Sequence, residues 1–142
     1  MTPGRARVLY DADCGFCRWA LGWVLRWDRG RALEPIALQD PRAAALLAPL
    51  DAERMMASWH LVEADGSITS AGVAGAKLLR LLPGGGAPAW LADRAPGMVE
   101  RAYRAIAGAR GSLGPRLSRS AIARADRLIA SRQIGAGDEP AP

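Results

Sequence analysis

The sequence has few cysteines, almost no lysine and no long apolar run. Two cysteines among 142 residues are too few for the disulfide framework of a small secreted scaffold. No uninterrupted apolar segment approaches the roughly 20 residues that cross a bilayer, which excludes an integral membrane protein. Before Asp11 the only apolar run is residues 8–10, and this run is too short for the core of a signal peptide. We therefore expect a soluble protein of the cytoplasm.

Positive charge is carried almost entirely by arginine, because Lys77 is the only lysine among 19 lysines and arginines. The net charge is +5, and eight arginines between Arg101 and Arg132 are opposed by Asp126 alone. Such a stretch could contact nucleic acid, an anionic membrane surface or an acidic partner. We do not expect nucleic acid, because aromatic residues do not alternate with these arginines as they do in proteins that bind single strands. The alternative is a solvated surface that is rich in arginine by compositional bias.

The overall composition is that of a chain with a packed core. Half of the residues are hydrophobic and 23% are charged, a balance typical of globular proteins. A chain of 142 residues also has the usual size of one domain. We predict one domain over residues 1–120 and a basic extension over residues 121–142, which is partly helical and ends in a frayed tail from residue 135.

The clearest predicted element is a helix that begins near Phe16. Apolar residues recur from there every three or four positions, and the opposite stripe includes Arg18 and Gly22. This spacing predicts an amphipathic helix of about four turns that ends near Gly30. We expect its apolar stripe to pack against a sheet, and the alternative is a platform for a ligand. That stripe contains three tryptophans at intervals of four residues, Trp19, Trp23 and Trp27.

The strands predict a mixed sheet. Residues 5–10 and 32–38 have the composition of strands, and Pro35 places the second of them at an edge or in an irregular stretch. Because a helix connects these two strands, we expect them to be parallel with a right-handed crossover. Asp65-Gly66 between short apolar runs is a strong hairpin signal and predicts an antiparallel pair. The sequence thus predicts an α/β fold around a four-stranded mixed sheet flanked by helices.

Further helices are predicted from N-cap residues, periodicity and the turn residues that end each segment. The last three of them are extra C-terminal helices beyond the sheet. Together they cover residues 40–48, 51–56, 70–82, 89–95, 97–109 and 118–134.

Cys14 and Cys17 stand where the first strand passes into the first helix. Their spacing puts both side chains on one face of the first helical turn, with β-carbons roughly 5 to 6 Å apart. A disulfide joins residues whose Cα atoms are about 5.5 to 6 Å apart, so this pair can close and open with little movement. A helix N-terminus favours negative charge, because its N–H groups are unpaired and the macrodipole is positive there. We therefore expect Cys14 to ionise readily and the pair to be redox-active.

Position along the helix suggests a role for each cysteine. Cys14 at the helix start would attack a substrate and form a mixed disulfide, and Cys17, one turn further, would resolve it. Gly15 between them would let another backbone approach the sulfur. Arg18 would add positive charge, with a small effect because it belongs to the exposed stripe.

Two carboxylates before the pair act in the opposite direction. Asp11 and Asp13 oppose the ionisation of Cys14, because a nearby negative charge raises the pKa of a thiol. We expect Asp13 to cap the helix. For Asp11 two interpretations stay open, a structural role in the turn and a proton relay to Cys17 during resolution.

The alternatives for the two cysteines are structural thiols and a metal site. A zinc site needs four ligands, and this chain offers the two cysteines and its single histidine, His60. We therefore predict neither a metal nor another cofactor. His60 lies in a predicted strand, where we expect it to be a packed residue.

The stretch from Tyr10 to Trp19 resembles the signature of the DCC family (DUF393) of predicted thiol-disulfide oxidoreductases. That signature is Asp-x-x-Cys-x-x-Cys, and Asp11, Cys14 and Cys17 match it. The resemblance covers about residues 5–120. It implies a thioredoxin-like fold, disulfide exchange and these three residues as the catalytic ones. It also implies a disulfide-bearing protein or a small thiol as substrate, and a cellular dithiol reductant as partner.

Some positions differ from the pattern of these relatives. Ala12 stands where the DCC family usually has glycine, and Phe16 replaces the proline between the cysteines of thioredoxin. Thioredoxins also place a cis-proline before their third strand to receive substrate backbone, but this chain has Met56-Ala57-Ser58-Trp59 there. We take Asp13, Gly15, Phe16, Arg18 and Ser58 to shape the site, and a small thiol or a single dedicated partner becomes an alternative to a general peptide substrate.

Three hypotheses for function follow. The first is an enzyme that exchanges disulfides through Cys14 and Cys17. The second is a non-catalytic adaptor on the same scaffold, which binds an acidic partner through the arginine-rich C-terminal third. The third is a redox sensor whose cysteine pair switches a partner contact without turnover, and sequence alone does not separate the sensor from the enzyme.

Overall fold

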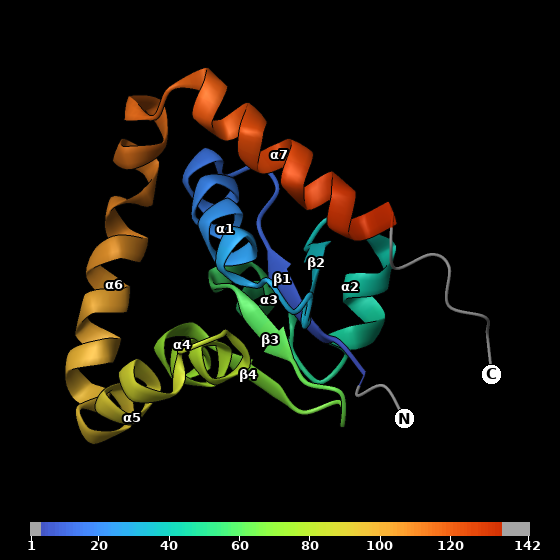
Figure 1. Cartoon of the computed structure of the whole chain (residues 1–142). Coiled ribbons are helices and arrows are strands. Elements are labelled where there is room, and N and C mark those ends of the chain that lie inside the picture. Colours follow the sequence, from blue (N-terminus) through green and yellow to red (C-terminus); the bar gives the residue numbers. More distant parts are fainter. Residues whose placement is uncertain (1–3, 135–142) are drawn as a thin grey trace.

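A four-stranded mixed sheet in the order β2-β1-β3-β4 lies at the centre of the fold (Figure 1). β1 (Ala6–Tyr10) pairs in parallel with β2 (Leu33–Ala37) and antiparallel with β3 (His60–Val62). β3 in turn pairs antiparallel with β4 (Ile68–Ser70). The predicted α/β fold class with a thioredoxin-like mixed sheet is therefore confirmed.

The structure is a computed structural model that describes residues 4–134, so the predicted frayed tail lies outside the described residues. Two separate hydrophobic clusters lie on the two faces of the sheet: α1 and α4 cover one face, and α2 and α3 cover the other. None of the described helices is long and apolar enough to cross a membrane. The helices are α1 (Gly15–Trp27), α2 (Pro41–Leu46), α3 (Ala52–Ala57), α4 (Ala71–Leu81), α5 (Gly86–Arg94), α6 (Pro96–Leu113), the 3-10 turn η1 (Gly114–Arg116) and α7 (Arg119–Ile134).

Short elements begin where the sequence has a local chemical signal. The Asp40 carboxylate accepts a backbone N–H two residues later and caps α2, and the Asp51 carboxylate does the same for α3 three residues later. Gly66 has a φ of +84°, which the tight turn between β3 and β4 requires and which glycine adopts without strain. Pro35 lies in the edge strand β2, as predicted.

α1 buries a different face from the predicted one. Its buried residues are Leu21, Gly22 and Leu25, whereas Trp23 is 55% and Trp27 40% exposed. The predicted packing of these two tryptophans against the sheet is therefore wrong. The physical reason is that Leu21 and Leu25 face the sheet and α7 packs on Gly22, so the two tryptophans lie at the surface.

α7 approaches α1 closely along its length (Figure 1). A Cβ on Gly22 would lie only 2.6 Å from the Ala125 Cβ, so the glycine is what allows this approach. Ile129 of α7 is 3% exposed and belongs to the cluster that α1 and α4 form on the sheet. α7 therefore contributes to the core, while the predicted division at residue 120 stays a prediction.

A buried ion pair joins the end of α1 to the end of α7. Asp28 caps α1, and its carboxylate accepts the N–H groups of Ala32 and Leu33 at 2.9 and 3.1 Å. Arg132 donates to the same carboxylate at 2.9 Å and to the carbonyls of Leu25 and Asp28 at 2.8 Å each. The side chains of Asp28 and Arg132 are 0% and 8% exposed. This arginine thus neutralises a buried carboxylate and satisfies the last carbonyls of α1.

Candidate active site

The first turn of α1 begins on a cysteine. Cys14 occupies the N-cap position in an extended conformation, and its Sγ accepts the backbone N–H of Cys17 at 3.2 Å. Its own N–H donates to the carbonyl of Asp11 at 3.3 Å. The prediction that Asp13 caps this helix is therefore wrong, because the sulfur of Cys14 takes the place of a carboxylate. A hydrogen bond from a helix N-terminus to sulfur favours the thiolate in the reduced protein.

Cys14 and Cys17 form a disulfide with a Cα–Cα separation of 5.2 Å. This separation lies inside the range of about 4.4 to 6.8 Å that disulfides adopt. The bond closes across the first turn, in line with the three-residue spacing of the pair. The site can therefore hold the oxidised form of a two-electron couple.

Gln39 holds the turn that precedes the disulfide. Its Oε1 accepts the N–H of Ala12 at 3.1 Å, and its Nε2 donates to Asp11 at 2.8 Å and to Asp13 at 3.2 Å. The Asp11 carboxylate also accepts the N–H of Asp13 at 3.0 Å. Sequence reasoning missed Gln39. A signal for Gln39 did exist in the sequence. Asp11 follows β1 and Gln39 lies just after β2, and the carboxyl ends of these two parallel strands meet at one edge of the sheet.

Two residues that were expected beside the sulfurs contact α7 instead. The Arg18 guanidinium donates to the Asp126 carboxylate at 2.8 Å. A Cβ on Gly15 would lie 3.3 Å from the Ile122 Cδ1, so the close neighbour of this glycine is a side chain, where we had expected a backbone. Residues of α7 therefore contact the first turn of α1.

The hydroxyl of Tyr10 lies in the same network. Burial raises the pKa of Tyr10, and the negative charge of Asp126 raises it further, while Arg18 and a hydrogen bond with Gln133 act in the opposite direction. Tyr10 is therefore a neutral hydrogen-bonding group between the end of β1 and α7 at physiological pH.

A cavity of about 310 Å³ lies on the Cys17 side of the disulfide. Cys17 lines it and Cys14 does not. Asp11, Phe16 and Ser58 also line it, so the structure brings these predicted site residues to one cavity, and Ser58 donates its hydroxyl hydrogen to the Trp59 carbonyl at 3.1 Å. The remaining walls come from β1, α1, α4, Trp59 before β3, and the α6 residues Tyr103, Ile106, Ala107 and Arg110.

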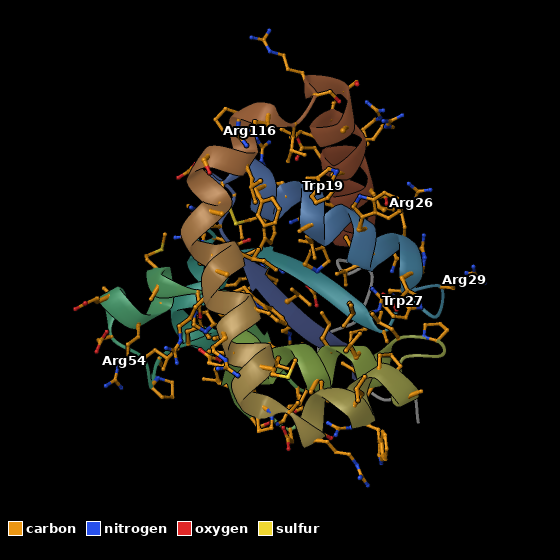
Figure 2. The ribbon with its side chains drawn as sticks, turned by 90° about the vertical axis from the view of Figure 1, so that its left-hand side faces the viewer. Trp19, Arg26, Trp27, Arg29, Arg54 and Arg116 are labelled. Atoms are coloured by element: carbon orange, nitrogen blue, oxygen red, sulfur yellow. A yellow bond between two sulfur atoms is a disulfide. The ribbon has the colours of Figure 1, made fainter. Side chains whose placement is uncertain are left out.

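The α6 wall of this cavity could not be foreseen from sequence. Figure 2 shows α6 in front of the sheet, running toward the turn at Arg116 and the start of α1. A Cβ on Gly114, at the end of α6, would lie 3.6 Å from the backbone N of Phe16. No local signal marks Arg110 as different from the other arginines of this region, because only the packing of α6 brings it to the cavity.

His60 lies away from any metal-binding arrangement. It is buried, its Nε2 donates to the Met55 carbonyl at 2.9 Å, and its Nδ1 accepts from the Ser70 hydroxyl at 2.6 Å. The expectation of a packed histidine is therefore confirmed. Among residues 4–134, no three His, Cys, Asp or Glu side chains gather in a group that could hold a metal ion.

Comparison with known proteins supports one family. No curated protein and no solved structure matches the chain. The family described as DCC1-like thiol-disulfide oxidoreductase matches residues 8–116, which include both cysteines, all of the sheet except the first two residues of β1, and the cavity walls. The match confirms the resemblance carried by the stretch from Tyr10 to Trp19. Since it spans more than half of the 142 residues, the chain belongs to the DCC1-like thiol-disulfide oxidoreductase family.

Proposed function

We propose that this protein is a thiol-disulfide oxidoreductase that transfers two electrons through Cys14 and Cys17. The observation that carries the proposal is the position of Cys14, whose sulfur accepts the Cys17 N–H at the start of α1 while it is bonded to Cys17. The same atom is therefore able to carry negative charge and to close a disulfide. These are the two properties that disulfide exchange requires.

In the reduced protein, Cys14 is the sulfur that attacks a substrate disulfide. Its thiolate is stabilised by the N–H groups and the dipole of α1. Attack forms a bond between Cys14 and one substrate sulfur and releases the other substrate sulfur as a thiolate. Cys17 then attacks the Cys14 sulfur, which closes the Cys14–Cys17 disulfide and releases the second substrate thiolate. A dithiol reductant in the cytoplasm returns the pair to its reduced form.

Asp11 is proposed to accept the proton of Cys17 during the second step. Both residues line the same cavity, and Gln39 holds the Asp11 carboxylate through a hydrogen bond of 2.8 Å. An Asp11→Asn variant is expected to slow the resolution step, and the deficit is expected to shrink as the pH rises and Cys17 ionises without help. A uniform loss at all pH values would instead indicate that Asp11 only shapes the turn.

The direct test is a redox titration of the purified protein in glutathione buffers, with free thiols counted by alkylation and mass spectrometry. We expect a reversible two-electron transition between roughly −120 and −270 mV, the range of known disulfide oxidoreductases. Cys17→Ser should accumulate a mixed disulfide on Cys14 when a disulfide substrate is added, and Cys14→Ser should not. A pair that never closes across this range would overturn the proposal.

No specific observation favours the adaptor hypothesis. Arg132 of the arginine-rich third is used inside the fold to hold Asp28, and Asp126 of the same region pairs with Arg18. The sensor hypothesis differs from the enzyme only in turnover. Catalytic reduction of an added disulfide, in excess of the protein concentration, would decide for the enzyme.

A further inference from the structure

The cavity beside Cys17 combines apolar walls with one cation, Arg110, which forms no ion pair within residues 4–134. Its volume of about 310 Å³ lies at the lower end of the roughly 300 to 1,000 Å³ of small-molecule sites. Most of its lining is aliphatic or aromatic, from Val8 of β1 to Ile106 of α6. Such a space accepts a compact apolar molecule and is too small for a folded peptide segment.

Arg110 supplies the charge. No ion pair within residues 4–134 involves its guanidinium. The other charged residue of the lining is Asp11, whose carboxylate is already held by Gln39 and the Asp13 N–H. Arg110 is therefore the lining residue that can hold an anionic group of a ligand, because arginine binds carboxylates with paired hydrogen bonds.

Arg110 belongs to the last turn of α6, near the start of α1, and lines the same cavity as Cys17. The N–H of Gly114 donates to the Arg110 carbonyl, one helical turn away. Gly114 is in turn adjacent to Phe16, between the two cysteines. The apolar body of a ligand would extend from there along α1, toward Leu21 and Val24.

We infer that this cavity binds a small dithiol with an aliphatic body and a carboxylate, and that this molecule is the reductant of the cysteine pair. The inference rests on the proposed function and names the class of its electron donor. Cys17, the cysteine that lines the cavity, is the one that the bound dithiol reaches. The substrate disulfide is attacked by Cys14, so the two half-reactions use different sulfurs.

The chemistry balances without any further reactant. One thiolate of the bound dithiol attacks the Cys17 sulfur, the Cys14–Cys17 bond breaks, and Cys14 leaves as the thiolate that the Cys17 N–H stabilises. The second thiolate of the ligand then attacks the ligand sulfur of the mixed disulfide. The ligand departs as a cyclic disulfide, and Cys17 is released as a thiolate and takes a proton. Two electrons pass to the pair, which delivers them to the substrate disulfide.

The test compares three dithiols that differ in the features named above. Dihydrolipoate has the aliphatic chain and the carboxylate, its amide has the chain alone, and dithiothreitol has neither. The rate of reduction of the oxidised protein is measured by rapid quenching and alkylation. We expect saturation with dihydrolipoate and a second-order rate constant about tenfold above that of the amide, the effect of one charge-assisted contact.

Two variants connect the rates to the cavity. Arg110→Gln should remove the advantage of dihydrolipoate over its amide, and any change in the rate with dithiothreitol should be much smaller than that loss. Arg104→Gln is the matched control, because Arg104 lies on the same helix, has a 74% exposed side chain and does not line the cavity. Ala107→Leu fills the cavity and should slow dihydrolipoate and its amide together.

A binding measurement supplies a readout without redox chemistry. Octanoate, which has the chain and the carboxylate but no thiol, should bind the oxidised protein in calorimetry, and Arg110→Gln should weaken that binding about tenfold. Equal rates for the acid and the amide, or octanoate binding that Arg110→Gln does not change, would overturn the inference. Either result with a normal glutathione titration leaves the proposed function in place, whereas a pair that does not titrate overturns both.

Discussion

Two helices of the C-terminal half pack on α1, and they make opposite kinds of contact. α7 comes so close that Gly22 faces Ala125 without room for a Cβ, and it buries Ala125, Ile129 and Arg132. α6 has no buried residue and leaves a cavity of about 310 Å³ against α1. One contact is closely packed at Gly22, and the other leaves a cavity beside the disulfide.

Arg132 of α7 and Arg110 of α6 illustrate the difference between the two helix contacts. Arg132 on α7 is 7% exposed and has a carboxylate and two carbonyls as acceptors. Arg110 on α6 lines a cavity and forms no ion pair within residues 4–134. The α7 contact holds α1 and therefore the N-cap geometry of Cys14, while the α6 contact leaves space for a ligand. A rigid helix with an open cavity at its start is how a binding site is usually kept preorganised.

The largest effect is expected at the buried ion pair of the α7 contact. Arg132→Ala should lower the free energy of unfolding by about 3 to 5 kcal/mol, because it leaves the Asp28 carboxylate buried without its counter-charge. Urea unfolding measures this loss. Arg127→Ala, an exposed arginine on the same helix, should change the free energy by no more than about 0.5 kcal/mol. Similar losses in both variants would mean that α7 does not hold α1 through this pair.

A second pair of variants compares the packing of α1 against α7 with the packing around α6. Gly22→Ala places a methyl group 2.6 Å from Ala125 and should cost about 1 to 3 kcal/mol through overpacking. Gly108→Ala on α6 meets nothing within 4 Å and should stabilise the protein by about 0.5 to 1 kcal/mol, because alanine has the higher helix propensity. Urea unfolding of both variants checks the sign. Destabilisation by Gly108→Ala would show that α6 is packed as tightly as α7.

Elements with a local chemical signal were predictable from the sequence. Asp40 before a proline, Asp65-Gly66 in the hairpin and the cysteine pair at the end of the first strand each carry their own geometry in a few residues. The parallel pairing of the first two strands and the antiparallel pairing of the last two followed from the helix between the former and the hairpin between the latter. For the same reason the disulfide could be predicted, because the two cysteines are three positions apart at the start of one helix.

Features that depend on contacts between distant helices could not be predicted. Trp23 and Trp27 form an apolar stripe with Trp19, yet they are exposed because Leu21 and Leu25 face the sheet and α7 packs on Gly22. Arg18 was assigned to solvent, but its partner Asp126 is 108 residues away. Arg110 and Arg132 look alike in the sequence and differ only in what lies across the helix from each. The periodicity of one helix does not say which of its sides another helix will bury.

A smaller effect is expected at high pH, from Tyr10 between the end of β1 and α7. Because its pKa is raised in the folded protein by burial and by Asp126, the unfolded chain loses this proton first as the pH rises through about 10. The folded state therefore loses stability above that pH, and the contribution is fully present below it. Urea unfolding at a series of pH values measures this slope. Tyr10→Phe should make the slope shallower, and an unchanged slope would assign the alkaline loss to other groups.

The smallest effect is expected at Arg18, although it stands next to Cys17. Its ion pair with Asp126 joins side chains that are 31% and 40% exposed, and pairs of this kind contribute about 0.2 to 1 kcal/mol. Its Nε is buried without a hydrogen-bond partner in the described residues, so Arg18→Gln also removes a desolvated donor and the net loss should stay below about 1 kcal/mol. The midpoint of the glutathione titration should hardly move, because Asp126 offsets the charge that Arg18 presents to the disulfide. A large shift of that midpoint would mean that α7, and not only the α6 side, tunes the cysteine pair.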